Sequence, residues 1–395
     1  MHSDSLPPTS RPKRSEPCLG CLNCFAFRDC GGIYDEGVLD CLAYCCGRPD
    51  RCSYVCPKNS RFVQIVRDTG GLSLRRGWQL SQSCSSSLPE YMPCIQHSST
   101  RDKALDVPFV VLPTFEVTPR RKTSGEMFTS GAELRSVFKI GRRTRIVLSC
   151  IDEDESLENF WRVKSVRLLA QRLSQLSIEH IIAPNFSLPL EIPRFDNIAN
   201  IKRSLLCAEE FSRAGMSVIP YVAGVTEQDW EFWAGFLRDH QEIAIVAKEF
   251  QTGGANITVA KWHIDRLLQL QDRIKRAVHV VAVGGRRHLR KLSEFAGVTL
   301  VNSDPFMKTC HRQLLTAAGR WEQWPTLPDE PLDDLLRTNV QRYARLIRQE
   351  FVRSRSPSLT AVVQPAFRSP DASQMQFAFT AGRNSQVEAQ QQVLL

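Results

Sequence analysis

The stretch EIAIVAKEFQTGG, residues 242–254, decides how this chain of 395 residues folds. Its apolar run from Ile243 to Ala247 is rich in β-branched residues, and charged residues and two glycines follow it closely. A short continuous apolar run of this kind is typical of a strand that is buried on both faces, as in a parallel sheet. The fold therefore depends on how often this pattern recurs.

Seven further segments share the pattern: YMPCIQH (91–97), FVVLPTF (109–115), RIVLSCID (145–152), EHIIAPN (179–185), MSVIPYV (216–222), VHVVAVGG (278–285) and VTLVNSD (298–304). Amphipathic helical stretches separate the later ones, for example LENFWRVKSVRLLAQRLSQL, residues 157–176. Alternating strands and helices indicate an α/β fold with a parallel sheet covered on both sides. Eight units fit a closed (β/α)8 TIM-like barrel over residues 91–320 better than an open doubly wound sheet, and no G-x-G-x-x-G motif follows the early strands.

Other segments flank this predicted barrel. We expect a disordered leader (1–16), a cysteine-rich metal module (17–60), a connector (61–90), an amphipathic helix (328–352) and a disordered tail (354–395). The helix has apolar residues at helical spacing, namely Leu332, Leu335, Leu336, Val340, Tyr343, Ile347 and Phe351. Its other side is rich in arginine and could dock a protein partner.

The composition and the first residues indicate in which compartment the protein works. No apolar run approaches the roughly 18 residues that cross a bilayer, and the first residues lack the apolar region of a secretory signal. We therefore expect a cytoplasmic protein without a membrane partner, in a compartment where thiols stay reduced. The formal charge of +9 is compatible with a phosphate-bearing partner such as DNA or RNA.

Nine of the 14 cysteines lie close together near the start of the chain: Cys18, Cys21, Cys24, Cys30, Cys41, Cys45, Cys46, Cys52 and Cys56. Clustered thiols at C-x-x-C spacing in a reducing compartment more often hold metal than form disulfides. The overlapping C-x-x-C-x-x-C triple suits an iron–sulfur cluster, whereas a zinc site takes four thiolates, usually as two separated C-x2-4-C pairs. Both metals stay open, and either would help to hold together a module too small for a large core.

Polar residues follow the predicted strands at their carboxyl ends, where (β/α)8 enzymes carry their chemistry. The candidates for catalysis are Asp152, Glu249 and Asp304. Asp152 and Asp304 each precede a helix and could simply cap it. Glu249 ends an otherwise apolar strand and precedes a TGG turn, so it is the stronger candidate.

The segment VGGRRHLRK, residues 283–291, predicts an anion site. Two glycines end the seventh strand, and a helix opens on basic residues, so backbone N–H groups could approach a phosphate. Many barrels bind phosphate in the loops after strands 7 and 8. The predicted phosphate or nucleic-acid ligands are Gly284, Gly285, Arg286, Arg287 and His288.

Five short phrases, IIAPNFS, SVIPYVAG, EFQTGG, HVVAVGG and VNSDPF, stand in this order at successive strand ends. In them the barrel region resembles the tRNA-guanine transglycosylase superfamily, in particular the branch that inserts deazapurines into DNA. The resemblance implies base exchange, in which a carboxylate attacks the anomeric carbon of a sugar, the old base leaves and a new base is installed. Asp152, Glu249 and Asp304 would supply the nucleophile and the acid or base. The zinc site that the family carries near the end of its chain has no counterpart here.

Three functions are consistent with these features. The first is a nucleic-acid base-modifying, transglycosylase-like enzyme whose cysteine module grips the polynucleotide or a partner. The second is a redox enzyme in which an iron–sulfur cluster supplies electrons to a substrate in the barrel. The third is a non-catalytic nucleic-acid or partner-binding component of a multi-protein complex.

Overall fold

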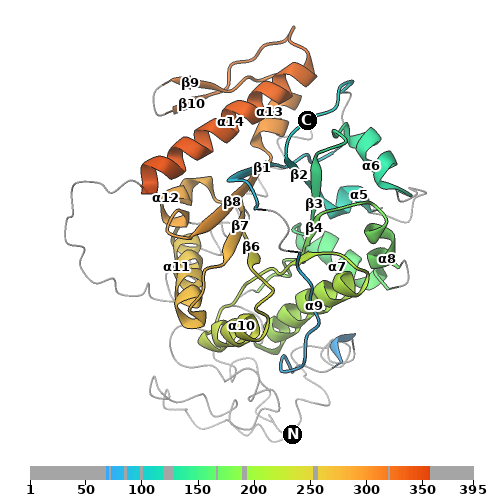
Figure 1. The fold of residues 1–395 in the computed structure, drawn as a ribbon, viewed down its shortest axis with the longest axis vertical. Coiled ribbons are helices and arrows are strands. Elements are labelled where there is room, and N and C mark those ends of the chain that lie inside the picture. The colour runs from blue at the N-terminus through green and yellow to red at the C-terminus, as the bar shows by residue number, and fades with distance from the viewer. Residues whose placement is uncertain are drawn as a thin grey trace, which may run out of the picture.

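The structure, a computed structural model, describes most of the chain between residues 68 and 355 (Figure 1). The described residues are 68–70, 73–83, 87–97, 101–118, 128–165, 168–188, 194–251, 257–318 and 321–355. The leader, the cysteine-rich module and nearly all of the predicted tail lie outside these ranges. The metal and disorder predictions made for them therefore stay predictions.

Each of the eight predicted strand segments contains a β-strand, and the α/β class is confirmed. The strands are β1 (Tyr91–Pro93), β2 (Phe109–Pro113), β3 (Arg145–Ser149), β4 (His180–Ile182), β5 (Val218–Ile219), β6 (Ile245–Phe250), β7 (His279–Gly284) and β8 (Gly297–Asn302). They form two four-stranded parallel sheets, in the orders β1-β8-β7-β6 and β2-β3-β4-β5.

Two short contacts join the edges of these sheets. Just after β1, Cys94 forms a parallel bridge with Val111 of β2. Just after β5, Tyr221 forms a parallel bridge with Ala247 of β6, whose N–H donates to the Pro220 carbonyl at 2.9 Å. Each sheet is thus hydrogen-bonded to the other at both of its edges, with fewer bonds than inside either sheet.

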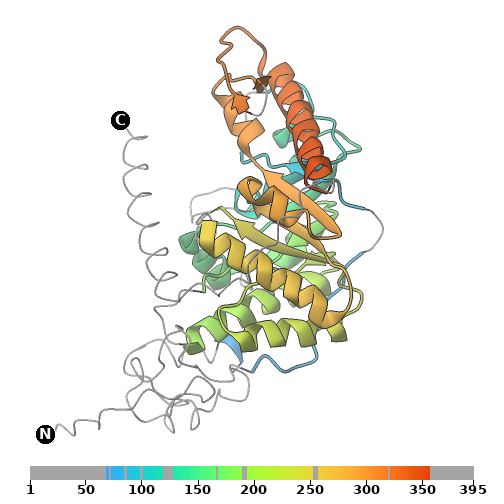
Figure 2. The ribbon, with the colours of Figure 1, turned by 90° about the vertical axis from the view of Figure 1, so that its left-hand side faces the viewer.

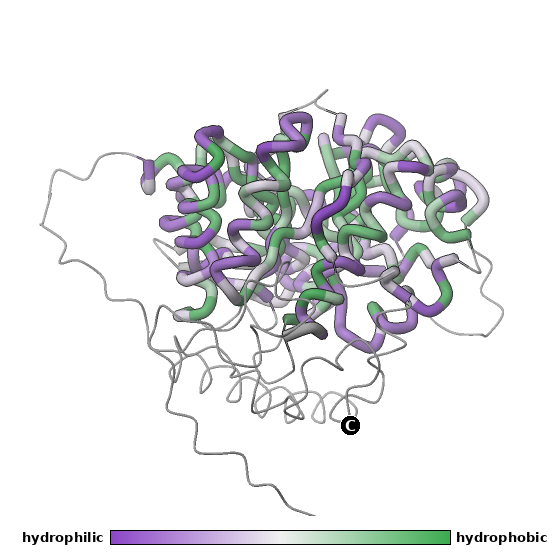
Figure 3. The backbone as a smooth tube through the Cα atoms, turned by 90° about the horizontal axis from the view of Figure 1, so that it is seen from below, coloured by the Kyte–Doolittle hydropathy of each residue, from purple (hydrophilic) through white to green (hydrophobic). Residues whose placement is uncertain are grey.

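Apolar side chains pack on both faces of the strands. The inner cluster takes alternate strand residues together with one residue before β1: Leu88, Met92, Phe109, Val111, Val147, Ile182, Ile219, Ile245, Ala247, Val281, Val283 and Val301. A larger outer cluster takes the intervening strand residues and joins them to the helices. Because successive strand side chains point to opposite faces, the inner cluster lies between the sheets and the outer one beneath the helices. Figure 3 shows hydrophobic segments toward the middle of the molecule and hydrophilic ones around them.

Helices follow most of the strands and surround them (Figures 1 and 2). They are α5 (Thr114–Val117), α6 (Gly131–Phe138), α7 (Asp154–Val163), α8 (Leu169–Ser174), α9 (Arg194–Arg213), α10 (Glu227–Asp239), α11 (Ile257–Ile274), the 3-10 helix η3 (Arg286–His288), α12 (Leu289–Leu292) and α13 (Asp304–Cys310).

The single helix predicted over residues 157–176 is in fact two, α7 and α8. Phe160 and Leu173 are both buried, yet at about 100° per residue a straight helix would place them on nearly opposite sides. A break between the two helices lets both residues face the core. At this break Leu168 takes a left-handed conformation with φ of 50° and leaves its side chain 57% exposed.

The amphipathic helix predicted near the end of the barrel is α14 (Leu332–Arg355). It begins directly after Pro331, a residue that suits the start of a helix because the first N–H groups of a helix have no partner within it. A hairpin that the sequence did not indicate, β9 (Thr316–Ala318) and β10 (Trp321–Gln323), precedes it. The helix packs against α12, α13 and β1, and Figure 2 shows it beside the strands at one end of the molecule.

The connector ahead of β1 is partly bound to the α/β region that follows it. We call residues 73–83 the strap. Leu74 and Trp78 of the strap are buried, and the Trp78 indole N–H donates to the Leu74 carbonyl at 3.0 Å. Ser81 donates its N–H to Ser212 at 3.0 Å. The strap therefore has its own apolar anchor on the folded chain.

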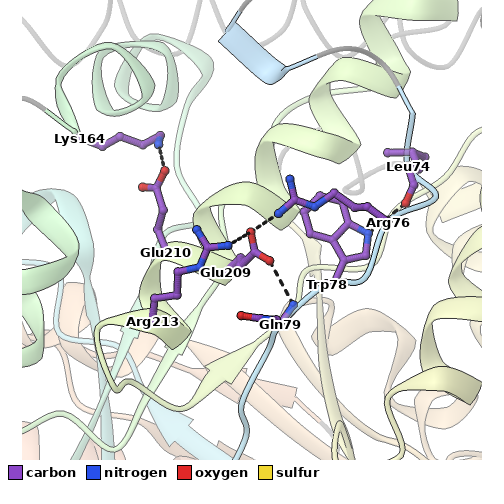
Figure 4. A network of polar contacts seen from close by, with 8 residues as sticks. All are labelled: Leu74, Arg76, Trp78, Gln79, Lys164, Glu209, Glu210 and Arg213. Carbon is purple, nitrogen blue, oxygen red and sulfur yellow. Dashed lines mark hydrogen bonds and ion pairs between the residues drawn. The ribbon is translucent and has the colours of Figure 1, made fainter.

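Glu209, on α9, holds the middle of the strap (Figure 4). Its side chain is 2% exposed and forms ion pairs with Arg76 of the strap and with Arg213 one helical turn away. Its Oε1 also accepts the backbone N–H of Gln79 at 3.1 Å. Three donors thus satisfy a carboxylate that burial would otherwise destabilise.

Gln82 lies where the strap crosses the start of β5 and β6. Its amide nitrogen donates to the carbonyls of Val218 and Ile245, both at 2.8 Å. Its amide oxygen accepts the N–H groups of Ala244 at 2.8 Å and of Ile245 at 2.7 Å. One buried side chain therefore supplies hydrogen bonds that an ordinary strand pair would make between β5 and β6.

Candidate active site

The three predicted carboxylates lie at the same end of the parallel strands. Asp152 follows β3, Glu249 is in β6, and Asp304 follows β8 as the first residue of α13. Because the strands are parallel, their carboxyl ends meet at one edge of the sheets. The three side chains nevertheless have different surroundings.

Glu249 faces the space between the sheets. Ile245 and Ala247 belong to the inner cluster, and the two-residue period of a strand puts Glu249 on the same face. Its side chain is 8% exposed, and its Oε2 accepts the N–H of Gln251 at 2.8 Å. In the pairing of β6 with β7, Glu249 stands opposite Val283. Glu249 is thus a carboxylate at the end of the apolar inner cluster.

Asp152 lies in the loop after β3, next to the loop after β4. Its backbone N–H donates to the side-chain oxygen of Asn185 at 3.0 Å, and its own Oδ1 accepts the N–H of Glu153 at 2.7 Å. Asn185 is 8% exposed, so this contact fixes Asp152 against a buried neighbour. Nearby, burial raises the pKa of the Cys150 thiol to about 12, and the Asp152 charge adds to this effect.

Asp304 lies on the side of the site that faces α14. Burial raises the pKa of Tyr91 and of Tyr343, and the Asp304 charge contributes to both shifts. The two tyrosine rings pack together with centroids 5.0 Å apart. The carboxylate of Asp304 is therefore close to a pair of phenols between β1 and α14, rather than on the inner cluster.

The predicted metal chemistry has no candidate at this site. Among the residues that the structure describes, no group of three or more His, Cys, Asp or Glu side chains could hold a metal ion. All nine clustered cysteines lie outside the described residues. Four free cysteines, Cys94, Cys150, Cys207 and Cys310, are described.

The two glycines at the end of β7 are required by close packing. Gly284 and Gly285 have φ of 75° and 79°, which side chains rarely adopt. A Cβ on Gly284 would lie 2.3 Å from Cγ of Gln251, and one on Gly285 would lie 3.0 Å from Cβ of Phe250. The glycines therefore let β7 lie against the residues that follow Glu249.

The three basic residues after these glycines have different surroundings. Arg286 pairs with Glu350 of α14 at 3.1 Å and stacks over the ring of Tyr343. His288 is 6% exposed, and burial lowers its pKa. Arg287 is exposed. Of the three predicted phosphate ligands that carry side chains, Arg287 alone is exposed, and Arg286 joins the end of β7 to α14.

Lys248, next to Glu249, points to the other face of β6. It is 5% exposed, and its Nζ donates to the Tyr221 hydroxyl at 3.2 Å. Burial lowers its pKa to about 8, while the Glu249 charge acts in the opposite direction. His263 of α11 is also buried, and burial followed by the Lys248 charge keeps its pKa well below the ordinary value. Neither Lys248 nor His263 was among the site residues predicted from the sequence.

The burial of Lys248 predicts that the stability of the folded chain depends on pH. Below about pH 8 Lys248 is protonated in both the folded and the unfolded chain, and its buried charge destabilises the folded chain. Between pH 8 and the ordinary pKa of 10.5, only the unfolded chain keeps the proton, so stability rises with pH. We expect Lys248→Met to abolish this rise and to raise the free energy of unfolding at pH 7 by about 1–3 kcal/mol.

The measurement is urea denaturation of the wild type, Lys248→Met and the exposed control Lys261→Met between pH 7 and 10.5. Subtracting the control removes the titration of other groups. Parallel stability curves for the wild type and Lys248→Met would contradict a destabilising charge at Lys248.

Comparison of the chain with models of known families and with curated proteins found no match. In the described residues, no helix combines the length and the low polarity that a bilayer-crossing segment needs. The interpretation of the site therefore depends on its own geometry.

Proposed function

We propose that the eight strands close into a (β/α)8 barrel. The bridges Cys94–Val111 and Tyr221–Ala247, together with the strand orders of the two sheets, support a ring in which every strand has two neighbours. The inner cluster would then fill the barrel, as layers of branched side chains fill such folds. The carboxyl ends of the strands would form its mouth.

We propose that this mouth carries a nucleic-acid base-modifying site. The observation that supports this most is Glu249, a buried carboxylate on the inner face, above an apolar interior. A carboxylate can attack the anomeric carbon of a nucleoside, form a glycosyl ester and release the base. Such covalent catalysis divides one difficult substitution into two easier ones.

In this mechanism Glu249 is the nucleophile and Asp152 the acid and base. Asp152 is held by Asn185 and would give a proton to the departing base, then accept one from the incoming base. The second base attacks the glycosyl ester, restores the nucleoside bond and frees the carboxylate. Asp304, beside Tyr91 and Tyr343, would support the wall of the site.

The test is incorporation of a radiolabelled purine or deazapurine into oligonucleotides, measured together with release of the original base. Exchange predicts that label enters in equal amount to base released. Release without incorporation would indicate a hydrolase. Neither reaction, with tight nucleic-acid binding retained, would favour a non-catalytic binding component instead.

The cysteine-rich module is proposed to bind metal, on the basis of its nine cysteines alone. Anaerobic purification followed by a visible spectrum and by iron, sulfide and zinc analysis separates the possibilities. Iron with sulfide and a reducible absorption band would favour the redox function. Zinc without colour would favour a module that stabilises the chain and contacts its partner.

A further inference from the structure

Four arginines of α14 lie on one side of the helix. Arg337, Arg345, Arg348 and Arg355 are all exposed, and we call them the arginine stripe. At about 100° per residue the four side chains fall within about 80° of one another around the helix, so they share one face. From first to last the stripe extends about 27 Å along the helix.

The apolar face of α14 is buried within the protein. Leu336, Val340, Tyr343, Ile347 and Phe351 are each 3% exposed or less. An amphipathic helix that binds a membrane inserts its apolar face into the lipid. Here that face is already packed against the rest of the chain, so the stripe can attract a partner only through charge and hydrogen bonding.

The charge of the stripe is only weakly compensated. Arg348 pairs with Glu90 at 3.2 Å and Arg337 with Asp334 at 3.0 Å, but the four side chains of these pairs are 33–76% exposed. Exposed ion pairs of this kind contribute little to stability, so a phosphate could replace the carboxylate at little cost. Within the described residues, no ion pair forms to Arg345 or Arg355.

The stripe belongs to a helix that is attached to the candidate site. α14 packs on α12 and α13, the helices that follow β7 and β8. Arg286, directly after β7, reaches Glu350 of α14. Arg286 thus contacts the side of α14 away from the stripe, whereas Arg348 of the stripe reaches Glu90, directly before β1, so a polymer bound along the stripe would lie toward the amino end of β1.

We propose that the arginine stripe binds the phosphate backbone of a nucleic acid. Arginine donates to phosphate in a planar, two-pronged geometry, and a stripe of about 27 Å spans about eight base steps of 3.4 Å. Backbone contacts of this kind give orientation and affinity without sequence preference. The inference rests on the proposed function only for the choice of nucleic acid as the polyanion.

The experiment measures binding of fluorescein-labelled single-stranded and duplex oligonucleotides by anisotropy, over a range of salt concentrations, with the full chain. The triple variant Arg345→Gln, Arg348→Gln, Arg355→Gln is compared with Arg142→Gln, Arg143→Gln, Arg172→Gln. The control loses the same charge from exposed arginines elsewhere. We expect the stripe variant to bind at least about tenfold more weakly and to lower the salt slope by about 2–3, whereas the control stays near the wild type.

Equal losses in the two variants would overturn the inference, because net charge rather than the stripe would then explain binding. Binding of anionic phospholipid vesicles that depends on the stripe, without nucleic-acid binding, would also overturn it in favour of a membrane surface. Stripe-dependent nucleic-acid binding by a chain with no base-exchange activity would support the inference and reject the proposed enzyme. The two proposals can therefore fail separately.

Discussion

Glu249→Gln is expected to lower the rate of base exchange by about 10³-fold or more, because an amide cannot form the glycosyl ester. The substitution keeps the size of the side chain, and its carbonyl oxygen can still accept the N–H of Gln251. Folding should therefore survive. The measurement is initial rate of label incorporation at saturating oligonucleotide, with thermal unfolding as the check on structure.

The matched control is Glu231→Gln, which removes the same charge from an exposed position on α10. It should keep full activity. Asp152→Asn is expected to lose about 10²- to 10³-fold, since the departing base can still leave unprotonated, although slowly. Full activity in both Glu249→Gln and Asp152→Asn would refute the assigned site, whatever reaction the chain performs.

Gln82→Ala is expected to lower the free energy of unfolding by about 3 kcal/mol or more. The substitution removes four hydrogen bonds and leaves backbone groups of Val218, Ala244 and Ile245 without these partners. Each buried polar group left without a partner costs about 1–3 kcal/mol, and water that enters the space recovers part of this. Equilibrium urea denaturation measures the loss.

Gln79→Ala serves as the control for this prediction. Gln79 is exposed and contributes its backbone N–H to Glu209, which alanine retains. Its effect should stay within about 0.5 kcal/mol. Should both variants be equally stable, the hydrogen bonds of Gln82 would not be what joins β5 to β6 at this end.

The strands could be predicted because their evidence is local. In β7, for example, a continuous run of small and branched apolar residues ends at two glycines, and both features depend on adjacent positions alone. The position of Glu249 near the carboxyl end of β6 could be predicted for the same reason, because it follows such a run. The side to which Lys248 points could not, since this depends on which face of β6 meets the inner cluster.

Features that depend on distant partners escaped prediction. Nothing around Gln82 distinguishes it from any polar residue in a serine-rich connector, because its acceptors lie 136 and 163 residues later. The sequence alone predicts that Arg286 binds phosphate. In the structure it donates to Glu350, which lies 64 residues later. The break between α7 and α8 likewise follows from where the core lies, which helical periodicity alone does not tell.

The long reach of Gln82 also sets an order of events during synthesis. Ile245, one of its partners, is made 163 residues after it. At about 5–20 residues per second, on the order of 10–30 s pass between the two. Throughout that interval the hydrogen bonds of Gln82 to Ala244 and Ile245 cannot form. The strap is thus among the first parts of the described chain to be made, yet the hydrogen bonds of Gln82 are complete only once the start of β6 has been made.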